Sequence, residues 1–404
     1  MKLLIEKDII SSSYDVYILL LDMSKAFDTV NRKVLLTELQ TVLEPDEIHL
    51  LGILTNRPQI SIFLDGERGE GFNTLVGICQ GDCLSAVLFI FYLASALKDD
   101  MQDQVPQDLK AFLDIFYADD LTYATTSKKH KTSIKNSTPQ KLEKHNLFVN
   151  RTKTEEGEAP DKRPPPPPPP PPDEDPGIKI SYSYYDWLVP PVMPTPEPSY
   201  KNIKLLGTKL DTKKDLTARK AKVWQPIQKF RHFFKSKRLS THHKIKIYKT
   251  YVETTLLYNS ETWSLTKSLE NSLNSFHRRL LRIALNIKYP KVISNEKLYS
   301  ITKETPITER IKRRRLALLG HILRLDPETP AQKALQYYLT PHKRPVGRPP
   351  VTWIQLITQD LTNTTKHHNI KTPLNPKSLE KLKEIAKDKE QWKREIVRSM
   401  KGNL

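Results

Sequence analysis

Nine consecutive prolines at residues 164–172 divide this chain of 404 residues. Proline has no backbone N–H and its ring fixes φ, so such a run forms an unpacked polyproline II helix and cannot join a sheet or an α-helix. Acidic residues flank the run, and six more prolines follow before residue 200. We therefore expect residues 156–199 to be a disordered or extended insert between two folded regions. A role as a ligand for Pro-recognising domains is the alternative for residues 164–172.

The two sides of this insert carry opposite charge. Residues 1–200 hold 20 Lys and Arg against 30 Asp and Glu, a net of −10, whereas residues 201–404 hold 45 against 16, a net of +29. A strongly basic half is typical of proteins that bind nucleic-acid phosphates. The densest patch is residues 310–315, which gives these candidate nucleic-acid contacts: Arg310, Lys312, Arg313, Arg314 and Arg315. Such a run can also be a solvated face or a nuclear localisation signal.

The acidic half places three carboxylates at two sites. Asp22 ends the apolar run 16–21, and Asp119 and Asp120 lie at the centre of residues 116–123 (FYADDLTY), which predict a β-hairpin with the acids at its turn. Clustered carboxylates repel one another unless a cation joins them. Two Mg²⁺ ions about 3.5–4 Å apart would hold the attacking and leaving oxygens of a phosphoryl displacement. A solvated turn is the alternative for the Asp-Asp pair, but its aromatic and apolar flanks disfavour it.

Five motifs in a fixed order resemble those of reverse transcriptases from non-LTR (LINE-like) retrotransposons. They are residues 21–31 (LDMSKAFDTVN), 77–89 (GICQGDCLSAVLF), 117–120 (YADD), 150–155 (NRTKTE) and 205–207 (LLG). The resemblance implies an α+β fold: a right-hand polymerase palm, in which helices pack on an antiparallel sheet, then an all-helical thumb and a basic helical tail. It also implies an RNA-directed DNA polymerase of a transposable element, a nucleotidyltransferase that adds dNTPs to a primer 3′-hydroxyl. Its partners would be an RNA template and a DNA primer or target.

The resemblance also assigns roles to single residues. Asp22, Asp119 and Asp120 would be the metal ligands, holding two Mg²⁺ ions with Mn²⁺ as a substitute, and Lys153 would be the general acid. The remaining assignments are Phe27, Gln80 and Gly81 at the incoming nucleotide, with Phe27 excluding a 2′-hydroxyl, and Leu206 and Gly207 in the hairpin that grips the primer.

Several of these residues have a structural alternative. Phe27 is equally well explained as a core aromatic on the helix after Asp22. Gly81 or Asp82 would also serve as the cap of the apolar helix 84–97. For Lys153, a solvated surface lysine is the commoner explanation from sequence alone.

Hydrophobic periodicity predicts the remaining elements. In the acidic half we expect, besides the elements above, helices at 31–42, 46–55 and 139–145 (with Thr138 as its cap) and a hairpin turning at Asp65-Gly66. After residue 200 we expect helices at 216–235, 241–257, 268–286, 308–324 and 376–400. Trp224, Trp263, Trp353 and Trp392 are expected in cores or interfaces, with stacking on single strands as the alternative. Helical spacing favours packing over base stacking for Tyr248, Tyr251 and Tyr258. The predicted domains are a palm at 1–155, the insert at 156–199, the primer-grip hairpin and thumb at 200–290, and a basic helical region at 291–404.

The first motif begins at Leu21, so we expect the fingers of the polymerase to be largely missing and the palm to be N-terminally truncated. Apolar surface around residues 19–21 would then be exposed, and the chain would bind primer-template without extending it detectably. The alternative function is that of a catalytically inactive, retrotransposon-derived nucleic-acid-binding protein. A structural protein with Pro-mediated partners would explain the insert alone.

Cysteine content and hydropathy exclude other classes. The two cysteines, Cys79 and Cys83, exclude a disulfide framework and a zinc knuckle in the basic half. No signal peptide precedes the first motif, and no apolar run is long enough to cross a membrane. We therefore expect a protein of the nucleus, the cytoplasm or both that is not secreted and has no membrane partner.

Overall fold

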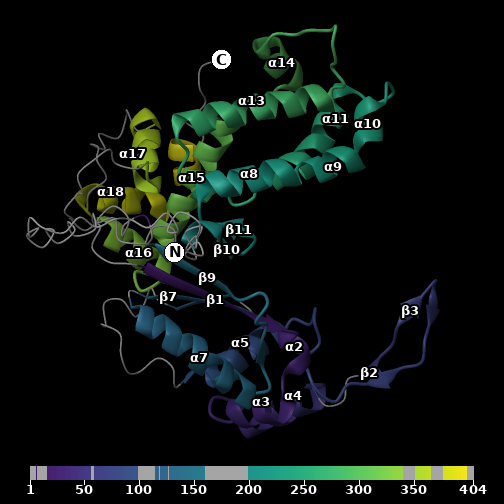
Figure 1. Ribbon diagram of the computed structural model, residues 1–404, viewed down its shortest axis with the longest axis vertical. Coiled ribbons are helices and arrows are strands. Elements are labelled where there is room, and N and C mark those ends of the chain that lie inside the picture. The colour runs from purple at the N-terminus through teal and green to yellow at the C-terminus, as the bar shows by residue number, and fades with distance from the viewer. Residues whose placement is uncertain are drawn as a thin grey trace, which may run out of the picture. The chain divides into compact units, whose positions relative to one another are not determined.

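The computed structural model describes residues 6, 16–55, 59–98, 114–117, 119–125, 127–159, 199–339, 351–364 and 376–397. Most of the predicted Pro-rich insert, residues 160–198, lies outside this part of the chain. The chain forms two compact units (Figure 1): the palm unit, Asp15–Glu158, and the helical unit, which combines Met1–Tyr14 with Ala159–Leu404. The regions predicted as thumb and as basic tail fall together in the helical unit.

The palm unit mixes strands and helices, as an α+β fold requires. Its elements are β1 (Val16–Ser24), α2 (Ala26–Thr29), α3 (Arg32–Leu39), α4 (Pro45–Thr55), β2 (Gln59–Ile60), β3 (Phe63–Leu64), β4 (Glu67–Arg68), β5 (Phe72–Asn73), α5 (Ser85–Ala96), β6 (Asp114–Tyr117), β7 (Asp120–Thr125), α7 (Lys128–Lys144), β8 (Phe148–Val149) and β9 (Glu155–Ala159). The last strand takes the sheet a few residues beyond the predicted palm boundary.

The main sheet is built around β1. Its strand order is β6-β7-β1-β8, with β9 also paired to β1, and the β1–β7, β1–β8 and β6–β7 pairs are antiparallel. Tyr17 is paired with Thr125 at one end of the β1–β7 ladder and Asp22 with Asp120 at the other. The predicted acidic hairpin is confirmed, since β6 and β7 meet with Tyr117 opposite Asp120.

Helices cover one face of this sheet (Figure 1), and residue alternation along β1 decides which side chains they meet. Leu19, Leu21 and Met23 join a core with Phe89 and Leu142 of α5 and α7. The intervening positions, Asp22 among them, point to the opposite face. The expectation that apolar surface is exposed around residues 19–21 is wrong, because all three leucines are buried.

Exposed apolar surface lies elsewhere in the palm unit. Of 23 exposed large hydrophobic side chains in the described chain, 14 fall between Val42 and Ile90. They include Leu50, Ile53 and Leu54 on α4, and Phe63 and Leu64 in the β3–β4 hairpin. Apolar surface of this extent marks an interaction site or an aggregation liability.

Local sequence signals determine most palm elements but misplace one helix. Asn31 caps α3 by accepting from the backbone N–H groups of Lys33 and Val34, and the β3–β4 hairpin turns at Asp65 and Gly66 as predicted. The helix predicted at 139–145 instead begins at Lys128, with Ser127 as its cap. Pro139 therefore lies inside α7, although its ring suits a first helical turn. The polar stretch before it carries little apolar periodicity, which is why the earlier start was missed.

The helical unit follows the basic half of the chain. Its elements are η3 (Tyr200–Asn202), β10 (Lys204–Leu205), β11 (Thr208–Lys209), α8 (Thr212–Lys222), α9 (Trp224–Lys229), α10 (Arg231–Lys235), α11 (Thr241–Ile247), η4 (Tyr248–Glu253), α12 (Thr254–Leu256), η5 (Ser260–Thr262), α13 (Lys267–Ala284), α14 (Asn295–Thr302), α15 (Ile307–Arg324), α16 (Pro330–Leu339), α17 (Trp353–Thr364), α18 (Pro376–Lys387), α19 (Lys389–Trp392) and η6 (Lys393–Val397).

Helical structure is present in all five regions predicted after residue 200, but three of them divide. Residues 216–235 form α8, α9 and α10, residues 241–257 form α11, η4 and α12, and the last region forms α18, α19 and η6. The helices α14, α16 and α17 were not predicted. Trp263, Trp353 and Trp392 are buried as expected, whereas Trp224 is half-buried beside Phe276.

The core of the helical unit contains a histidine without a hydrogen-bond partner. His277 of α13 is 1% exposed, and neither ring nitrogen contacts a donor or acceptor in the described chain. Burial, aided by the nearby positive charges of Arg310 and Arg278, lowers the pKa of His277 to about 3. The rings of Tyr248 and Tyr299 lie on either side of it.

This histidine makes a pH dependence of stability testable. Because its pKa is depressed in the folded state, the unfolded state binds more protons below pH 6.5, and stability falls as the pH falls. Between pH 7 and pH 5 we expect a loss of about 2 kcal/mol from this residue. His277→Phe should flatten that dependence in urea unfolding. An unchanged slope in the variant would assign the acid sensitivity to other groups.

In the described residues, no helix combines the length and the apolar character needed to cross a membrane.

Candidate active site

Two of the predicted acids face each other across the sheet. Asp22 of β1 and Asp120 of β7 are paired in antiparallel register, so their side chains leave the same face, opposite the helix layer. Asp119 immediately precedes Asp120 at the β6–β7 turn. Directly opposed carboxylates destabilise a sheet unless a cation compensates them.

Lys153 of the fourth motif supplies one such cation. The motif is tied to β1 because Met23 pairs with Val149 and the Asn150 N–H donates to the Asp22 carbonyl over 2.7 Å. The turn that follows brings Lys153 Nζ to 3.2 Å from Asp22 Oδ2. Lys153 is largely exposed, so it is both a surface lysine and a partner of the first predicted catalytic acid.

Asp22 also has an oxygen suited to a metal ion. Its Oδ2, the atom that faces Lys153 Nζ at 3.2 Å, is inaccessible to solvent and accepts no hydrogen bond from the described residues. Carboxylate oxygens are the preferred ligands of Mg²⁺. Among the described residues, no three His, Cys, Asp or Glu side chains gather closely enough to hold a metal. The structure therefore unites Asp22 and Asp120 and leaves Asp119 outside a compact three-carboxylate cluster.

The second motif docks on the first through its backbone. The Gly77 N–H donates to the Val30 carbonyl over 2.8 Å and the Ile78 N–H donates to the Phe27 carbonyl over 2.9 Å. The Phe27 ring stacks on Phe89 of α5 with centroids 4.5 Å apart, but it remains partly exposed. Phe27 is thus a core aromatic that keeps some accessible surface, so neither explanation of it is excluded.

Gln80 and Gly81 lie in the exposed loop that leads from this docked segment into α5. Gly81 has a positive φ of 95°, a conformation that glycine adopts without strain. Asp82 accepts a hydrogen bond from the Leu84 N–H over 3.2 Å. The predicted cap by Gly81 or Asp82 is nevertheless wrong, because α5 begins at Ser85 with Leu84 as its N-cap and without a side-chain cap bond.

Sequence reasoning missed Arg32, which joins the two motifs. Its guanidinium donates to the carbonyls of Thr74, Val76 and Gly77 and to the Thr74 hydroxyl, over distances of 2.6–3.1 Å. Burial lowers the pKa of Arg32. An arginine directly after the Asn31 cap was the available signal, but its partners lie more than 40 residues along the chain.

Gly77 should tolerate no side chain. A Cβ at this position would lie 2.7 Å from the Asp28 carbonyl oxygen, and the φ of 86° disfavours other residues. We expect Gly77→Ala to destabilise the palm unit by about 1–3 kcal/mol from backbone strain, with the clash adding to this. Gly81→Ala is the matched control, because its φ is similar but no atom lies within 4 Å. Equal destabilisation in thermal unfolding would show that the contact with Asp28 is unimportant.

A family comparison decides what this arrangement is. The model of the reverse transcriptase (RNA-dependent DNA polymerase) family matches residues 5–210, which is half of the chain. The chain belongs to this family. A transposon-derived protein of Caenorhabditis elegans is 24% identical to this reverse transcriptase over 153 residues, 37% of this chain and 52% of that protein. The match thus spans about half the length of its curated relative.

Solved structures give more distant likenesses. Telomerase from Candida tropicalis in complex with a TWJ fragment of telomeric RNA aligns over 94% of this chain and 50% of that chain, with 14% identity and a TM-score of 0.39. Apo telomerase from the same organism, truncated from the C-terminal domain, aligns over 39% and 34%, with 18% identity and a TM-score of 0.33.

The predicted primer-grip residues form a tight turn in the helical unit of this reverse transcriptase. Leu206 and Gly207 join β10 to β11, and both have positive φ. Arg219 donates to the Gly207 carbonyl over 2.6 Å, and the Tyr258 hydroxyl donates to the Leu206 carbonyl over 3.1 Å. The Arg219 guanidinium also lies over the Tyr258 ring. Both turn carbonyls are thereby fixed, while the Leu206 side chain stays exposed.

Most cations of the basic run 310–315 bind other groups of the protein. Arg310 pairs with Glu253 and Glu304, and Lys312 pairs with Glu309 over 2.9 Å. Arg314 donates to the Leu257 carbonyl over 2.6 Å, and the Nε of Arg313 is buried.

Arg315 is wrong as a predicted nucleic-acid contact. It is 2% exposed and pairs with buried Asp360 over 2.7 Å. Three of the five predicted contacts thus connect α15 to other segments of the helical unit: Arg310, Arg314 and Arg315.

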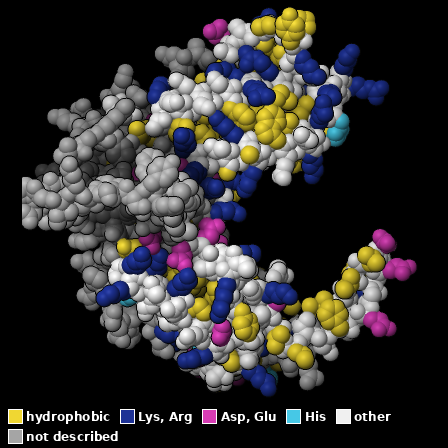
Figure 2. Space-filling model, viewed as in Figure 1, with side chains coloured by type: hydrophobic (Ala, Val, Ile, Leu, Met, Phe, Trp, Pro, Cys, Tyr) yellow, Lys and Arg dark blue, Asp and Glu magenta, His cyan; other side chains and the backbone are white. Residues whose placement is uncertain are grey.

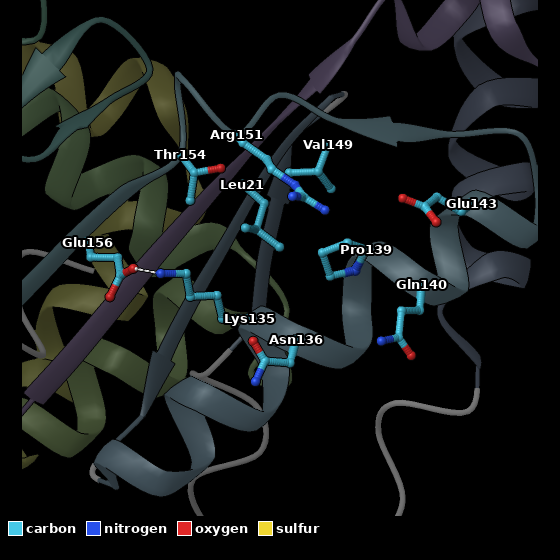
Figure 3. A pocket seen from close by; sticks show the side chains of 10 residues that line it. All are labelled: Leu21, Lys135, Asn136, Pro139, Gln140, Glu143, Val149, Arg151, Thr154 and Glu156. Atoms are coloured by element: carbon cyan, nitrogen blue, oxygen red, sulfur yellow. Dashed lines mark hydrogen bonds and ion pairs between the residues drawn. The ribbon is translucent and has the colours of Figure 1, made fainter.

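A cavity of about 820 Å³ lies between α7 and the fourth motif (Figure 3). Leu21, Val149 and Arg151 face Pro139 and Gln140 across it, and the Lys135–Glu156 ion pair borders it. Because Leu21 and Asp22 point to opposite faces of β1, this cavity is separate from the acidic pair.

Proposed function

We propose that this protein is an RNA-directed DNA polymerase of a non-LTR retrotransposon, which adds dNTPs to a primer 3′-hydroxyl on an RNA template. The observation that carries the proposal is the pairing of Asp22 with Asp120 on the face of the sheet opposite α5 and α7, with Lys153 Nζ at 3.2 Å from Asp22. Two opposed carboxylates and a lysine from the fourth motif thus share one end of the β1–β7 ladder, which supports a site for divalent ions.

Asp22, Asp119 and Asp120 would hold two Mg²⁺ ions, for which Mn²⁺ can substitute. When bound, these ions neutralise the triphosphate and hold the reacting oxygens. The Oδ2 of Asp22 is paired with Lys153 and accepts no hydrogen bond from the described chain, and its carboxylate chemistry fits a divalent ion. Closing the Asp119 turn towards β1 would complete the set.

The other predicted residues act on the substrates. Lys153 carries a proton on Nζ and would deliver it to the leaving pyrophosphate. The accessible part of Phe27 would contact the sugar of the dNTP and exclude a 2′-hydroxyl. Gln80 and Gly81 would contact the nucleotide and template, since an exposed glycine loop allows close backbone approach. Leu206 and Gly207 would support the DNA primer.

Primer extension by the purified full chain tests the proposal. With an RNA template, a DNA primer, dNTPs and Mg²⁺ or Mn²⁺, the polymerase proposal predicts incorporation that Asp119→Asn abolishes. That result would overturn the expectation from the sequence that the chain binds primer-template without extending it detectably. Asp28→Asn is the matched control, because Asp28 is an exposed carboxylate of the same first motif and should leave incorporation unchanged. Equal incorporation by the Asp119→Asn variant would refute the metal assignment.

The second candidate is a nucleic-acid-binding protein that has lost polymerisation. It is favoured by the absence of a compact three-carboxylate group among the described residues. Primer-template binding without incorporation in either metal would support this candidate. Binding that is independent of salt would contradict both, because Lys and Arg contacts release counterions from phosphates.

A further inference from the structure

The helical unit contains a second basic segment, separate in sequence from the run 310–315. Residues 216–252 hold 11 Lys and Arg and three His but no Asp or Glu. Four of these cations have internal roles: Arg219 pairs with Asp215, Lys249 pairs with Glu304, Lys220 donates to Ser272 and Lys244 is buried. The other seven are exposed and form no ion pair with a described carboxylate: Lys222, Lys229, Arg231, Lys235, Lys237, Arg238 and Lys246.

These cations occupy one region of the surface. They belong to α8–α11 and the connections between them, and Figure 2 shows Lys, Arg and His side chains gathered around the end of the unit where α10 and α11 lie. Unlike the paired arginines of α15, they are not offset by local negative charge. Their field therefore favours a polyanion.

Accessible aromatic rings lie among them. The rings of Phe230 and Tyr251 stack with centroids 4.3 Å apart and an interplanar angle of 28°, and Phe233 contacts the His232 ring at 4.1 Å. Tyr251 is 47% exposed and Phe233 is 38% exposed. Tyr251 lies in the π-helical turn η4 (Tyr248–Glu253), a distortion that is frequent at functional sites.

We propose that this basic–aromatic face, formed by the seven unpaired cations with Phe230, Phe233 and Tyr251, binds single-stranded nucleic acid. The cations contact phosphates, and bases stack on the accessible faces of Tyr251 and Phe233. In a duplex the base faces are already covered by neighbouring bases, so the rings add affinity only for single strands. This role goes beyond polymerisation and does not require the acidic pair.

Fluorescence anisotropy with the full chain tests this surface, using a 20-nucleotide RNA and the same sequence as a duplex. We expect Phe233→Ala/Tyr251→Ala to weaken single-strand binding about ten-fold or more and duplex binding by less than two-fold. Tyr251→Phe keeps the ring and its stack on Phe230, so it should bind as the unaltered chain does. Tyr289→Ala is the control for removal of an exposed aromatic, since Tyr289 is 92% exposed and lies outside the face.

A charge series separates phosphate binding from stacking. Lys229→Ala/Lys235→Ala/Lys246→Ala should weaken binding of both ligands. For the single strand, the slope of log K against log salt concentration should also become shallower. The change should be about 0.7 for each phosphate that is no longer neutralised. Lys381→Ala/Lys389→Ala removes exposed lysines of α18 and α19 and should change neither quantity.

Two outcomes would overturn the proposal. One is an equal decrease of single-strand and duplex affinity in the aromatic variant, and the other is no decrease at all. Thermal unfolding of each variant checks that the fold is retained.

Discussion

Asp120→Asn is expected to stabilise the metal-free protein and to remove the proposed polymerase activity. Asp22 and Asp120 lie directly opposite each other, and like charges in this position destabilise a sheet by roughly 0.2–1 kcal/mol. Neutralising one of them relieves that repulsion. The same change removes a carboxylate from the proposed metal site, and we expect incorporation to fall by at least ~10²-fold, the scale seen when an electrostatic stabiliser of a transition state is removed.

Thermal unfolding with EDTA and with Mg²⁺, paired with primer extension, measures both effects. The unaltered chain should gain stability from Mg²⁺, whereas the Asp120→Asn variant should not. Asp119→Asn is the matched control, because Asp119 lies at the turn rather than opposite Asp22. That variant should lose activity without gaining stability in EDTA. A less stable Asp120→Asn variant in EDTA would show that Asp120 is held by favourable contacts rather than repelled.

Arg315→Ala should cost about 3–5 kcal/mol, because it would leave Asp360 buried without its cation. Arg315 Nη1 lies 2.7 Å from Asp360 Oδ2, and both side chains are at most 5% exposed. Burial lowers the pKa of Arg315 and raises the pKa of Asp360, each against the opposing effect of its partner. Burial of both charges carries a desolvation penalty that such a pair offsets only with good geometry and further hydrogen bonds.

The double variant Arg315→Met/Asp360→Leu should recover most of that stability, because apolar side chains of similar volume need no desolvation of charge. Lys333→Ala is the control, since its partner Glu328 is exposed and such pairs contribute ~1 kcal/mol or less. Urea unfolding followed through the tryptophans of the helical unit provides the free energies. A double variant as unstable as Arg315→Ala would show that the pair itself, rather than the isolated charge, supports the fold.

Prediction from the sequence was most accurate for the site residues whose signal lies in the few positions around them. An apolar run ending in Asp22 and an aromatic-flanked Asp-Asp pair each predict a β element with acid at its tip, and the paired β1 and β7 agree. The register itself was not predictable, because alternation within a strand gives its faces but not its partner residue.

Long-range partners explain the main failures. The run 310–315 was predicted to be exposed. However, Arg310 pairs with Glu253, 57 residues away in the sequence, and Arg315 pairs with Asp360, 45 residues away. No local pattern distinguishes such an arginine from an exposed one. Arg32 was missed for the same reason, and its contacts hold the second motif against the first. The uncompensated cations of 216–252 were overlooked because they are dispersed rather than consecutive.

The central position of β1 has a consequence for how the palm unit acquires its structure. Tyr17 pairs with Thr125, 108 residues later in the chain, and Met23 pairs with Val149. Pairing between strands this distant in sequence makes folding slow, because the entropy of closing the loop is spent before the pairing can compensate for it. During synthesis β1 would therefore remain unpaired until β7 has emerged, with apolar residues 16–21 accessible to chaperones. The acidic pair and the folded sheet would then form in the same kinetic step.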